Sequence, residues 1–281
     1  MSDPRRTSRT TRPRGLAVAL LLILGSRSAR GVDPRTALVS DVQDNSLLIE
    51  EAYNQEQGVV QNILTLEMDA DGGRERDWEL AFSQEWPLFS SDHQIAFTLP
   101  FEAVEPDGRA SGLGDLELAY RYQLFRETEV WPAVAPSFGL SLPTGSEDRG
   151  FGNGTVGYGL SLPASKVLTD RFALNGNAGV SIAPHVAGNV LDDYLLGVSA
   201  IYAVDHSLDL FVEWVANSVQ VVEDGHSQRD FLSRVSPGAR YAFDLAGGQL
   251  VVALAAPIGT TPESPDWGLF VYLSFERRLW E

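Results

Sequence analysis

The sequence predicts an all-β fold, an antiparallel up-and-down transmembrane β-barrel of about 12 strands. Three observations favour this fold. Apolar and polar residues alternate with a period of two in many short segments, short and long connections alternate between those segments, and aromatic residues recur at one spacing on the apolar faces. Together these features are typical of bacterial outer-membrane barrels.

The alternation is clearest in GDLELAYRYQL, residues 114–124. Leu and Tyr side chains fall on one face of this segment, and mostly charged or amide side chains fall on the other. A period of two indicates a strand with a different environment on each side. A soluble sheet would place protein core and water there, whereas a membrane barrel would place lipid and an aqueous lumen there.

Segments of this kind follow one another to the end of the chain. The predicted strands cover residues 59–68, 78–86, 93–101, 114–124, 132–142, 155–163, 172–182, 193–204, 208–216, 231–243, 249–258 and 267–276. Many are close to the ~9–11 residues of a tilted membrane strand. Proline inside or at the ends of several segments blurs their boundaries.

The connections between these segments alternate in length. The short ones are 87–92, 126–129, 165–171, 205–207 and 244–248, and the long polar ones are 69–77, 103–114, 144–154, 184–193, 217–230 and 259–266. Outer-membrane barrels have short periplasmic turns and long extracellular loops. The alternation therefore favours a membrane barrel over a soluble one.

Aromatic residues bracket the apolar faces of three strands at the same spacing. The pairs are Tyr194 and Tyr202, Trp267 and Phe275, and Trp78 and Trp86. Eight residues at ~3.3 Å each, tilted by ~40°, give an axial separation of roughly 20 Å, near the height of the apolar band of such barrels. The spacing predicts two aromatic girdles, so the Leu and Tyr face of residues 114–124 is expected to face lipid.

The N-terminus predicts export to the cell envelope. Five arginines precede the apolar stretch GLAVALLLILG (15–25) and the small residues SRSA (26–29), which is the pattern of a signal peptide. We expect a signal peptide over residues 1–28, a short periplasmic N-terminal segment over 29–57 and the barrel over 58–281, in an outer membrane of the Gram-negative type. Cleavage after Ser28 would change the net charge from −17 to −22.

Composition and motif spacing argue against several classes of function. The acidic net charge disfavours nucleic acid as a partner, and a chain without cysteine has neither disulfides nor thiolate metal sites. GNGTVG (152–157) matches a dinucleotide motif but precedes a strand, and DADGG (69–73) lacks the Glu that a calcium loop needs at its twelfth position. We expect no cofactor and no metal-binding residues.

An enzyme is not expected either. Outer-membrane lipid hydrolases use Ser and His, and Ser181 and His185 share one face of a predicted strand. Their spacing separates them by about 13 Å along the strand, which is too far for a nucleophile and its base to share a hydrogen bond. The sequence therefore predicts no catalytic residues.

The inward face of the barrel is expected to carry the function. Small residues predominate on this face over 132–182, whereas charged residues gather on other strands. The candidate lumen-lining residues are Asp115, Glu117, Arg121, Asn175, Asn177, Asp209, Glu213, Arg240 and Glu276. Phe211, Phe270 and Tyr272 also point inward, so part of the lumen is expected either to be blocked or to suit an apolar solute.

Several stretches resemble a family of bacterial outer-membrane proteins that are grouped as candidate transporters and are related to the MetA-pathway of phenol degradation proteins. They are LLIEEAYNQEQGVVQNI (47–63), SQEWPLFSSDHQIAFTLPF (83–101), GLGDLELAYRYQL (112–124), GLSLPTGSEDRGFGNG (139–154) and SPGARYAF (236–243). The resemblance covers about residues 46–281. It implies an outer-membrane barrel that contacts lipid and lipopolysaccharide and moves small molecules. Its partners would include the barrel assembly machinery, which often reads a terminal aromatic residue, whereas here Glu281 follows Trp280.

The leading prediction is a passive, porin-like channel or transporter for small solutes, with apolar or aromatic solutes as one option. A non-conducting structural or adhesive envelope barrel is the first alternative, and an outer-membrane lipid hydrolase is the second. Acidic residues outnumber arginines in the long loops, which predicts a weak preference for cations.

Overall fold

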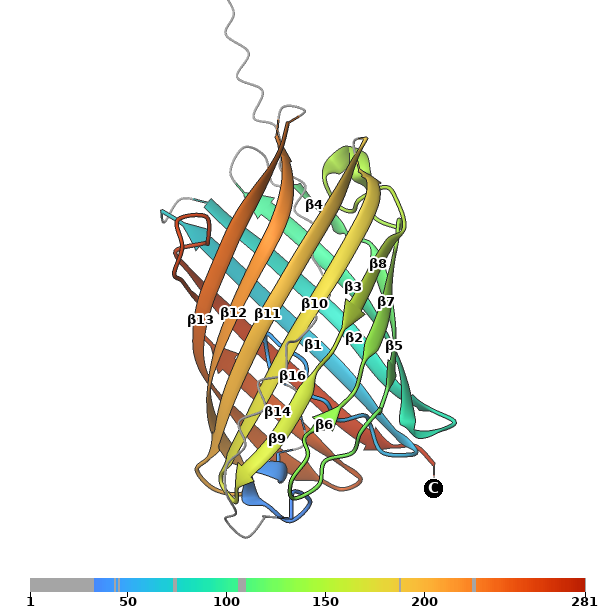
Figure 1. Ribbon diagram of the computed structural model, residues 1–281, viewed down its shortest axis with the longest axis vertical. Coiled ribbons are helices and arrows are strands. Elements are labelled where there is room, and N and C mark those ends of the chain that lie inside the picture. The colour runs from blue at the N-terminus through green and yellow to red at the C-terminus, as the bar shows by residue number, and fades with distance from the viewer. Residues whose placement is uncertain are drawn as a thin grey trace, which may run out of the picture.

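The computed structural model describes residues 33–42, 44, 46–72, 75–105, 110–186, 188–223 and 226–280. These residues form a closed antiparallel β-barrel with 12 strands around its circumference (Figure 1). The predicted fold class is confirmed. The predicted signal peptide over 1–28 lies outside the described residues.

Four of the 12 strands are interrupted, so the barrel contains 16 strand segments. They are β1 (Val59–Asp71), β2 (Glu75–Leu88), β3 (Ser90–Glu105), β4 (Ala110–Leu113), β5 (Leu116–Tyr122), β6 (Ala133–Val134), β7 (Ser137–Leu142), β8 (Gly157–Ser161), β9 (Ala164–Thr169), β10 (Phe172–Val186), β11 (Asn189–Ala203), β12 (Leu208–Glu223), β13 (His226–Leu245), β14 (Gly248–Ala255), β15 (Ile258–Gly259) and β16 (Trp267–Arg278). Two short 3-10 helices, η1 (Leu38–Ser40) and η2 (Glu147–Arg149), complete the described elements. Within this part of the chain, no helix has the length and hydropathy needed to cross a membrane.

Each strand pairs with its neighbours along the chain, and the first strand pairs with the last. Val59 of β1 lies opposite Arg278 of β16, and this pairing closes the barrel. Pro136, Pro163 and Pro257 fall at three of the four interruptions, between β6 and β7, β8 and β9, and β14 and β15. Proline has no N–H group to donate to a neighbouring strand, which explains the breaks at these positions.

All the predicted strands are present, but several extend further than predicted. The β1–β2 and β12–β13 hairpins continue as strands through most of 69–77 and 217–230, which the sequence predicted as loops. Polar and charged residues predominate in these extensions, and the apolar positions that do alternate, Val219 and Val221, are too few to mark a strand. The predicted turn over 165–171 is also mostly strand, because β9 resumes pairing with β10 immediately after Pro163.

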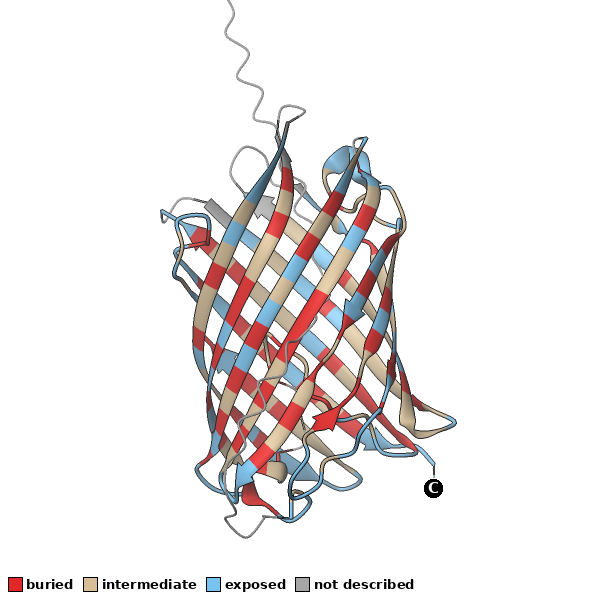
Figure 2. Cartoon of the chain, viewed as in Figure 1, coloured by how far each residue is buried: buried red, intermediate tan, exposed pale blue. Residues whose placement is uncertain are grey.

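The two faces of the strands differ as the alternation predicts (Figure 2). On β5, Leu118, Tyr120 and Tyr122 are each 39% exposed on the outer face, whereas Arg121 between them is 5% exposed. The outer face is therefore the apolar one that lipid would cover, and the inner face of β5 is polar, whereas other strands also turn apolar residues such as Phe211 and Phe270 inward. In such barrels the short turns lie on the periplasmic side.

Candidate functional site

Residue 44 and residues 46–57, which precede β1, lie inside the barrel. Helix η1 sits at the end of the barrel that carries the short turns (Figure 1), where the Leu38 N–H donates to the Asp170 carboxylate in the turn between β9 and β10 (3.1 Å). From there, residue 44 and residues 46–57, which we call the lumen segment, contact inward-facing side chains. The sequence analysis assigned this stretch to the periplasm because it has no strand pattern. Hydrogen bonds to the barrel wall hold it in the lumen instead.

The first part of the lumen segment is held by Glu213 of β12. Its carboxylate accepts hydrogen bonds from the backbone N–H groups of Leu47 and Leu48, both at 3.0 Å. Beside it, the Asn175 amide donates to the Ser46 hydroxyl at 3.3 Å. Glu213 and Asn175 are fully buried, so these bonds replace the water that would otherwise solvate them.

A second group of contacts centres on Arg240 of β13. Its guanidinium lies 2.9 Å from the Asp209 carboxylate and 3.3 Å from the Glu51 carboxylate. It also donates to the backbone carbonyl of Asp44 at 2.8 Å. Buried charges are tolerated when they are paired and hydrogen-bonded. Asp209 of the wall meets part of this need, and the lumen segment adds a second carboxylate and a carbonyl acceptor to Arg240.

Arg121 of β5 holds the last part of the lumen segment. Its guanidinium donates to the Asn54 side chain and to the Tyr53 carbonyl, both at 2.8 Å. The carboxylates of Glu50 and Glu85 each lie 3.8 Å from it. One arginine thus joins the segment to the walls formed by β2 and β5.

Other wall residues bind the backbone of the same part of the segment. The Ala52 N–H donates to the Ser165 hydroxyl, and the Gln55 N–H donates to the Gln94 side chain, both at 2.8 Å. Backbone groups of a non-strand segment inside a barrel need partners, and polar side chains of the wall supply them.

Lys166, the only lysine in the chain, belongs to a cluster at the periplasmic end. Its ammonium lies 2.7 Å from the carboxylate of Glu127, a side chain that is 3% exposed. The Tyr53 hydroxyl donates to the same carboxylate at 2.5 Å, and the Val167 N–H donates to it at 2.8 Å. Glu127 lies in the connection between β5 and β6, so this connection also secures the lumen segment.

The inward aromatic residues are covered by the chain itself. Phe211, Phe270 and Tyr272 belong to one buried apolar cluster with Leu38 and Val39 of η1, and Leu47 and Leu48 pack against it. This part of the lumen is therefore occupied by the protein's own N-terminal residues, which is the first of the two possibilities that the sequence left open.

The predicted lumen-lining residues fall into three groups: those joined to the lumen segment, Glu117 and Asp115. Six contact the lumen segment directly, and Asp209 is joined to it through Arg240: Arg121, Asn175, Asn177, Asp209, Glu213, Arg240 and Glu276. Glu117 faces the lumen further from the short turns and is half-buried. Glu276, which bonds to the Gln55 side chain, also lines a cavity at the periplasmic mouth.

Asp115 secures an extracellular loop. Its two carboxylate oxygens accept hydrogen bonds from the backbone N–H groups of Gly145 (3.0 Å) and Asn153 (2.8 Å). Phe151 of the same loop is buried, and a Cβ on Gly112 would lie 2.7 Å from its ring. The GNGTVG stretch, which includes Gly152 at φ +104°, therefore belongs to a loop that is packed against the barrel.

Carboxylates line the half of the lumen nearer the long loops. Glu67 of β1 lies directly opposite Glu79 of β2, and Glu79 lies directly opposite Glu102 of β3. We call these three residues the glutamate row. All three are half-buried rather than buried, so this wall is accessible to solvent. Like charges in directly opposed positions destabilise a sheet, and solvent access reduces that cost.

Arg234 of β13 reaches across the lumen to this wall. Its guanidinium lies 2.7 Å from the Glu67 carboxylate and 3.3 Å from the Asp69 carboxylate. The arginine neutralises part of the negative charge of this wall, and the net charge of the wall stays negative.

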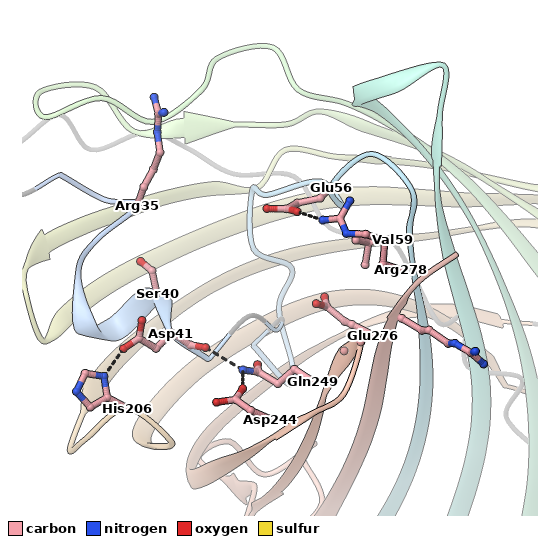
Figure 3. Close-up of a pocket in the computed structure, with 13 residues that line it drawn as sticks. Arg35, Ser40, Asp41, Glu56, Val59, His206, Asp244, Gln249, Glu276 and Arg278 are labelled. Carbon is pink, nitrogen blue, oxygen red and sulfur yellow. Dashed lines mark hydrogen bonds and ion pairs between the residues drawn. The ribbon is translucent and has the colours of Figure 1, made fainter. Parts of the chain in front are cut away.

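A cavity of about 840 Å³ opens at the periplasmic mouth (Figure 3). His206 lies 2.6 Å from the Asp41 carboxylate, and Gln249 donates to the Asp41 carbonyl at 3.0 Å. On the other side of the cavity, Arg278 is paired with Glu56 at 2.5 Å. The cavity thus lies between the turns of the barrel and the two ends of the N-terminal residues that enter and leave the lumen.

Sequence reasoning missed the lumen segment and part of the glutamate row. The missed residues that form contacts are Asp44, Ser46, Glu50, Glu51, Asn54, Gln55, Glu67 and Glu102. One signal was present in the sequence: LLIEEAYNQEQGVVQNI (47–63) was among the stretches that resemble the family most specifically, although it lacks a strand pattern over 47–57. A polar stretch that precedes a barrel and has no strand pattern can therefore be hypothesised to lie in the lumen.

Ser181 and His185 stay apart on β10. Ser181 pairs with Asp193 of β11, and His185 falls at a bulge beyond it, with φ of 64° and an exposed side chain. The other histidines described with side chains, His93 and His206, bond to Tyr120 and Asp41 respectively.

The closed barrel, its apolar outer face and its polar lumen together define an outer-membrane β-barrel. The family described as "Putative MetA-pathway of phenol degradation" matches residues 58–244, and the chain belongs to this family. Among curated proteins no match is found.

A solved outer-membrane channel shows the same fold. The COG4313 outer membrane channel from Pseudomonas putida F1 matches with a TM-score of 0.63 and 17% identity, over 83% of this chain and 99% of that chain. The KdgM porin matches with a TM-score of 0.45 and 9% identity, over 77% of this chain and 98% of that chain. LpxR from Salmonella typhimurium matches with a TM-score of 0.41 and 11% identity, over 77% and 99% of the two chains. The protein is thus a barrel of the kind that the channel from Pseudomonas putida F1 also forms.

Proposed function

We propose that the protein is an outer-membrane channel through which small hydrophilic solutes move passively, with a preference for cations. The glutamate row is the observation that carries this proposal. It places three half-buried carboxylates side by side on the inner wall of a barrel whose outer face is apolar, with one of the Glu79 oxygens shielded from solvent. A wall of one charge sign raises the local concentration of ions of the opposite sign.

The contacts in the lumen favour hydrophilic solutes over apolar or aromatic ones. Phe211, Phe270 and Tyr272, which would suit an apolar solute, are covered by Leu47 and Leu48. The solvent-accessible part of the wall is polar instead. Membership in the family does not identify a solute. The side chains that solvent can reach in the lumen are therefore the better evidence for the kind of solute.

Current measurements on purified protein test the proposal. We expect discrete conductance steps after reconstitution into planar lipid bilayers in KCl, and none from protein that was heat-denatured before reconstitution. A variant that lacks residues 33–57 supplies the decisive comparison, because it removes the chain that occupies the lumen. Silence from both forms would overturn the channel and favour a structural or adhesive barrel, and release of fatty acids from lipopolysaccharide vesicles would favour a lipid hydrolase.

A further inference from the structure

The lumen segment has two parts that are held by different interactions. The first part, residue 44 and residues 46–48, lies against the apolar cluster and Glu213. The second part, residues 50–55, which we call the returning arm, leads back toward β1 and lies against β2, β3 and β5. Ile49 connects the two parts and lies against Gly197 of β11.

Release of the first part would expose apolar surface. Leu47 and Leu48 cover a cluster that includes Phe211, Phe270 and Tyr272. Transfer of such surface to water is unfavourable in proportion to its area. The first part is therefore anchored in the lumen.

Release of the returning arm would expose mainly polar groups. Its polar contacts are hydrogen bonds and ion pairs to Arg121, Gln123, Gln94, Ser165 and Arg240, and its apolar contact is the small Ala52 side chain against Ala133 and Ala135. Water can replace such bonds on both partners, so their net contribution to docking is modest. The returning arm is thus the part of the lumen segment that separates from the wall at the lower cost.

The returning arm also lies where a path through the lumen would pass. The Glu50 side chain is 42% exposed even though it is inside the barrel, so it borders solvent-accessible space. On the same side, Thr65, Thr98 and Glu117 of β1, β3 and β5 are half-exposed on the inner wall. Beyond the other end of the arm, Glu56 lines the cavity at the periplasmic mouth.

We propose that the returning arm is the gate of the channel and that Arg121 is the side chain that holds it shut. In the open state the arm leaves β2, β3 and β5, while the first part of the segment stays docked on the apolar cluster. Arg121 suits this role because its one guanidinium contacts the Asn54 side chain, the Tyr53 and Glu51 carbonyls and the Glu50 carboxylate. This inference rests on the proposed channel function.

Removal of the arginine tests the gate. We expect Arg121→Ala to raise the open probability of single channels several-fold over that of the unmodified protein. Arg234→Ala is the matched control, because it removes the same charge from the same lumen but from a side chain that bonds to Glu67 and Asp69 of β1. The control variant is expected to increase cation preference and to leave the open probability within twofold. Equal open probabilities for Arg121→Ala and the unmodified protein would overturn the role of Arg121.

A reversible cross-link tests the movement itself. The chain has no cysteine, and Ala52 in the middle of the returning arm shares a buried cluster with Ala133 of β6, so that cysteines at these two positions lie close enough for a disulfide. In the double variant Ala52→Cys with Ala133→Cys, oxidation fixes residue 52 to β6 and so keeps the returning arm docked on the wall. We expect oxidation to suppress current and reduction to restore it, whereas each single variant is insensitive to both treatments.

The outcomes separate this inference from the channel proposal. Equal currents before and after oxidation, with the disulfide verified by mass spectrometry, would overturn the gate and leave the channel intact. Silence from every variant, including the one that lacks residues 33–57, would overturn the channel and the gate together.

Discussion

Glu213 illustrates how single side chains of the wall position the lumen segment. Its carboxylate binds two successive backbone N–H groups, an arrangement that fixes the direction of the chain at Leu47 and Leu48. A fully buried carboxylate without those donors would be costly, so the segment and the wall stabilise each other.

Truncation of Glu213 is expected to destabilise the protein measurably. Glu213→Ala removes the acceptor of both hydrogen bonds, so the N–H groups of Leu47 and Leu48 lose their partner. This loss is expected to lower the free energy of unfolding by about 1–3 kcal/mol. Urea unfolding in lipid vesicles measures the loss. Glu213→Gln keeps one oxygen acceptor and should lose less, and identical stabilities for Glu213→Ala and the unmodified protein would contradict the assigned contacts.

The protonation of Glu51 is expected to couple the lumen segment to pH. Burial raises the pKa of Glu51 above its usual 4.5; Arg240 opposes this rise and Asp44 adds to it. The docked arm therefore binds a proton more tightly than a released, hydrated arm does. By linkage, docking strengthens as the pH falls from neutral toward 4.5 and weakens as the pH rises through the raised pKa.

Single-channel recording across this pH range checks the sign. We expect open probability to decrease on acidification, and the decrease to become smaller in Glu51→Gln, which does not titrate at this position. An increase in open probability on acidification would show that another group controls the arm.

At the residue scale, the sequence predicted which side chains face inward but not what they contact. Arg121, Arg240 and Glu213 were predicted as lumen-lining from the period of two alone, and the structure places all three on the inner face. The alternation shows only on which face of a strand a side chain lies. Its contacts across the lumen depend on strand tilt and on segments that have no repeating pattern of apolar residues. The partners of these residues in the lumen segment lie 67 to 196 positions away in the chain, as Asn54 and Asp44 show.

At the scale of the elements, the strands were predicted well where one face meets lipid. The alternation weakens in the hairpin extensions, where polar and charged residues predominate, and at Pro136 and Pro163, where the pairing of strands is interrupted. The lumen segment was missed for a related reason. It has neither a strand period nor a helical period, since polar groups of the wall determine its course.

A strand in this barrel is expected to tolerate arginine on one face and not on the other. Val198 of β11 is exposed on the apolar outer face between Tyr194 and Tyr202, so Val198→Arg should cost ~2–4 kcal/mol of folding stability near the bilayer midplane. The matched control is Thr65→Arg of β1, because Thr65 is half-exposed on the lumen side. Ser199, the neighbour of Val198, is unsuitable as a control because it is fully buried and bonded to Ser46 at 3.1 Å.

Unfolding titrations of the two variants in vesicles of one lipid composition provide the comparison. The lumen variant should lose much less stability than the lipid-facing variant. Equal losses would show that the outer face of β11 does not contact lipid.

At the scale of the whole molecule, the charge distribution predicts ion selectivity. Reversal potentials in a KCl gradient should show cation preference near 0.1 M salt, where charges act over ~10 Å, and the preference should fade near 1 M, where screening shortens this range to ~3 Å. Replacement of Glu67, Glu79 and Glu102 by Gln should reduce the preference at low salt. Anion preference of the unmodified protein at low salt would contradict the assignment of the glutamate row to the conducting path.

The closure of the barrel has a consequence for biogenesis. The first strand meets the last one, with Val59 opposite Arg278, so the ring closes only after the whole chain is available. The wall residues that bind the lumen segment, from Gln61 to Arg278, all follow it in the chain. The segment can therefore dock only after the wall exists. A newly assembled copy therefore passes through a stage in the membrane in which its lumen is unplugged. The rate at which its N-terminal residues thread into the lumen sets how long that leaky stage lasts.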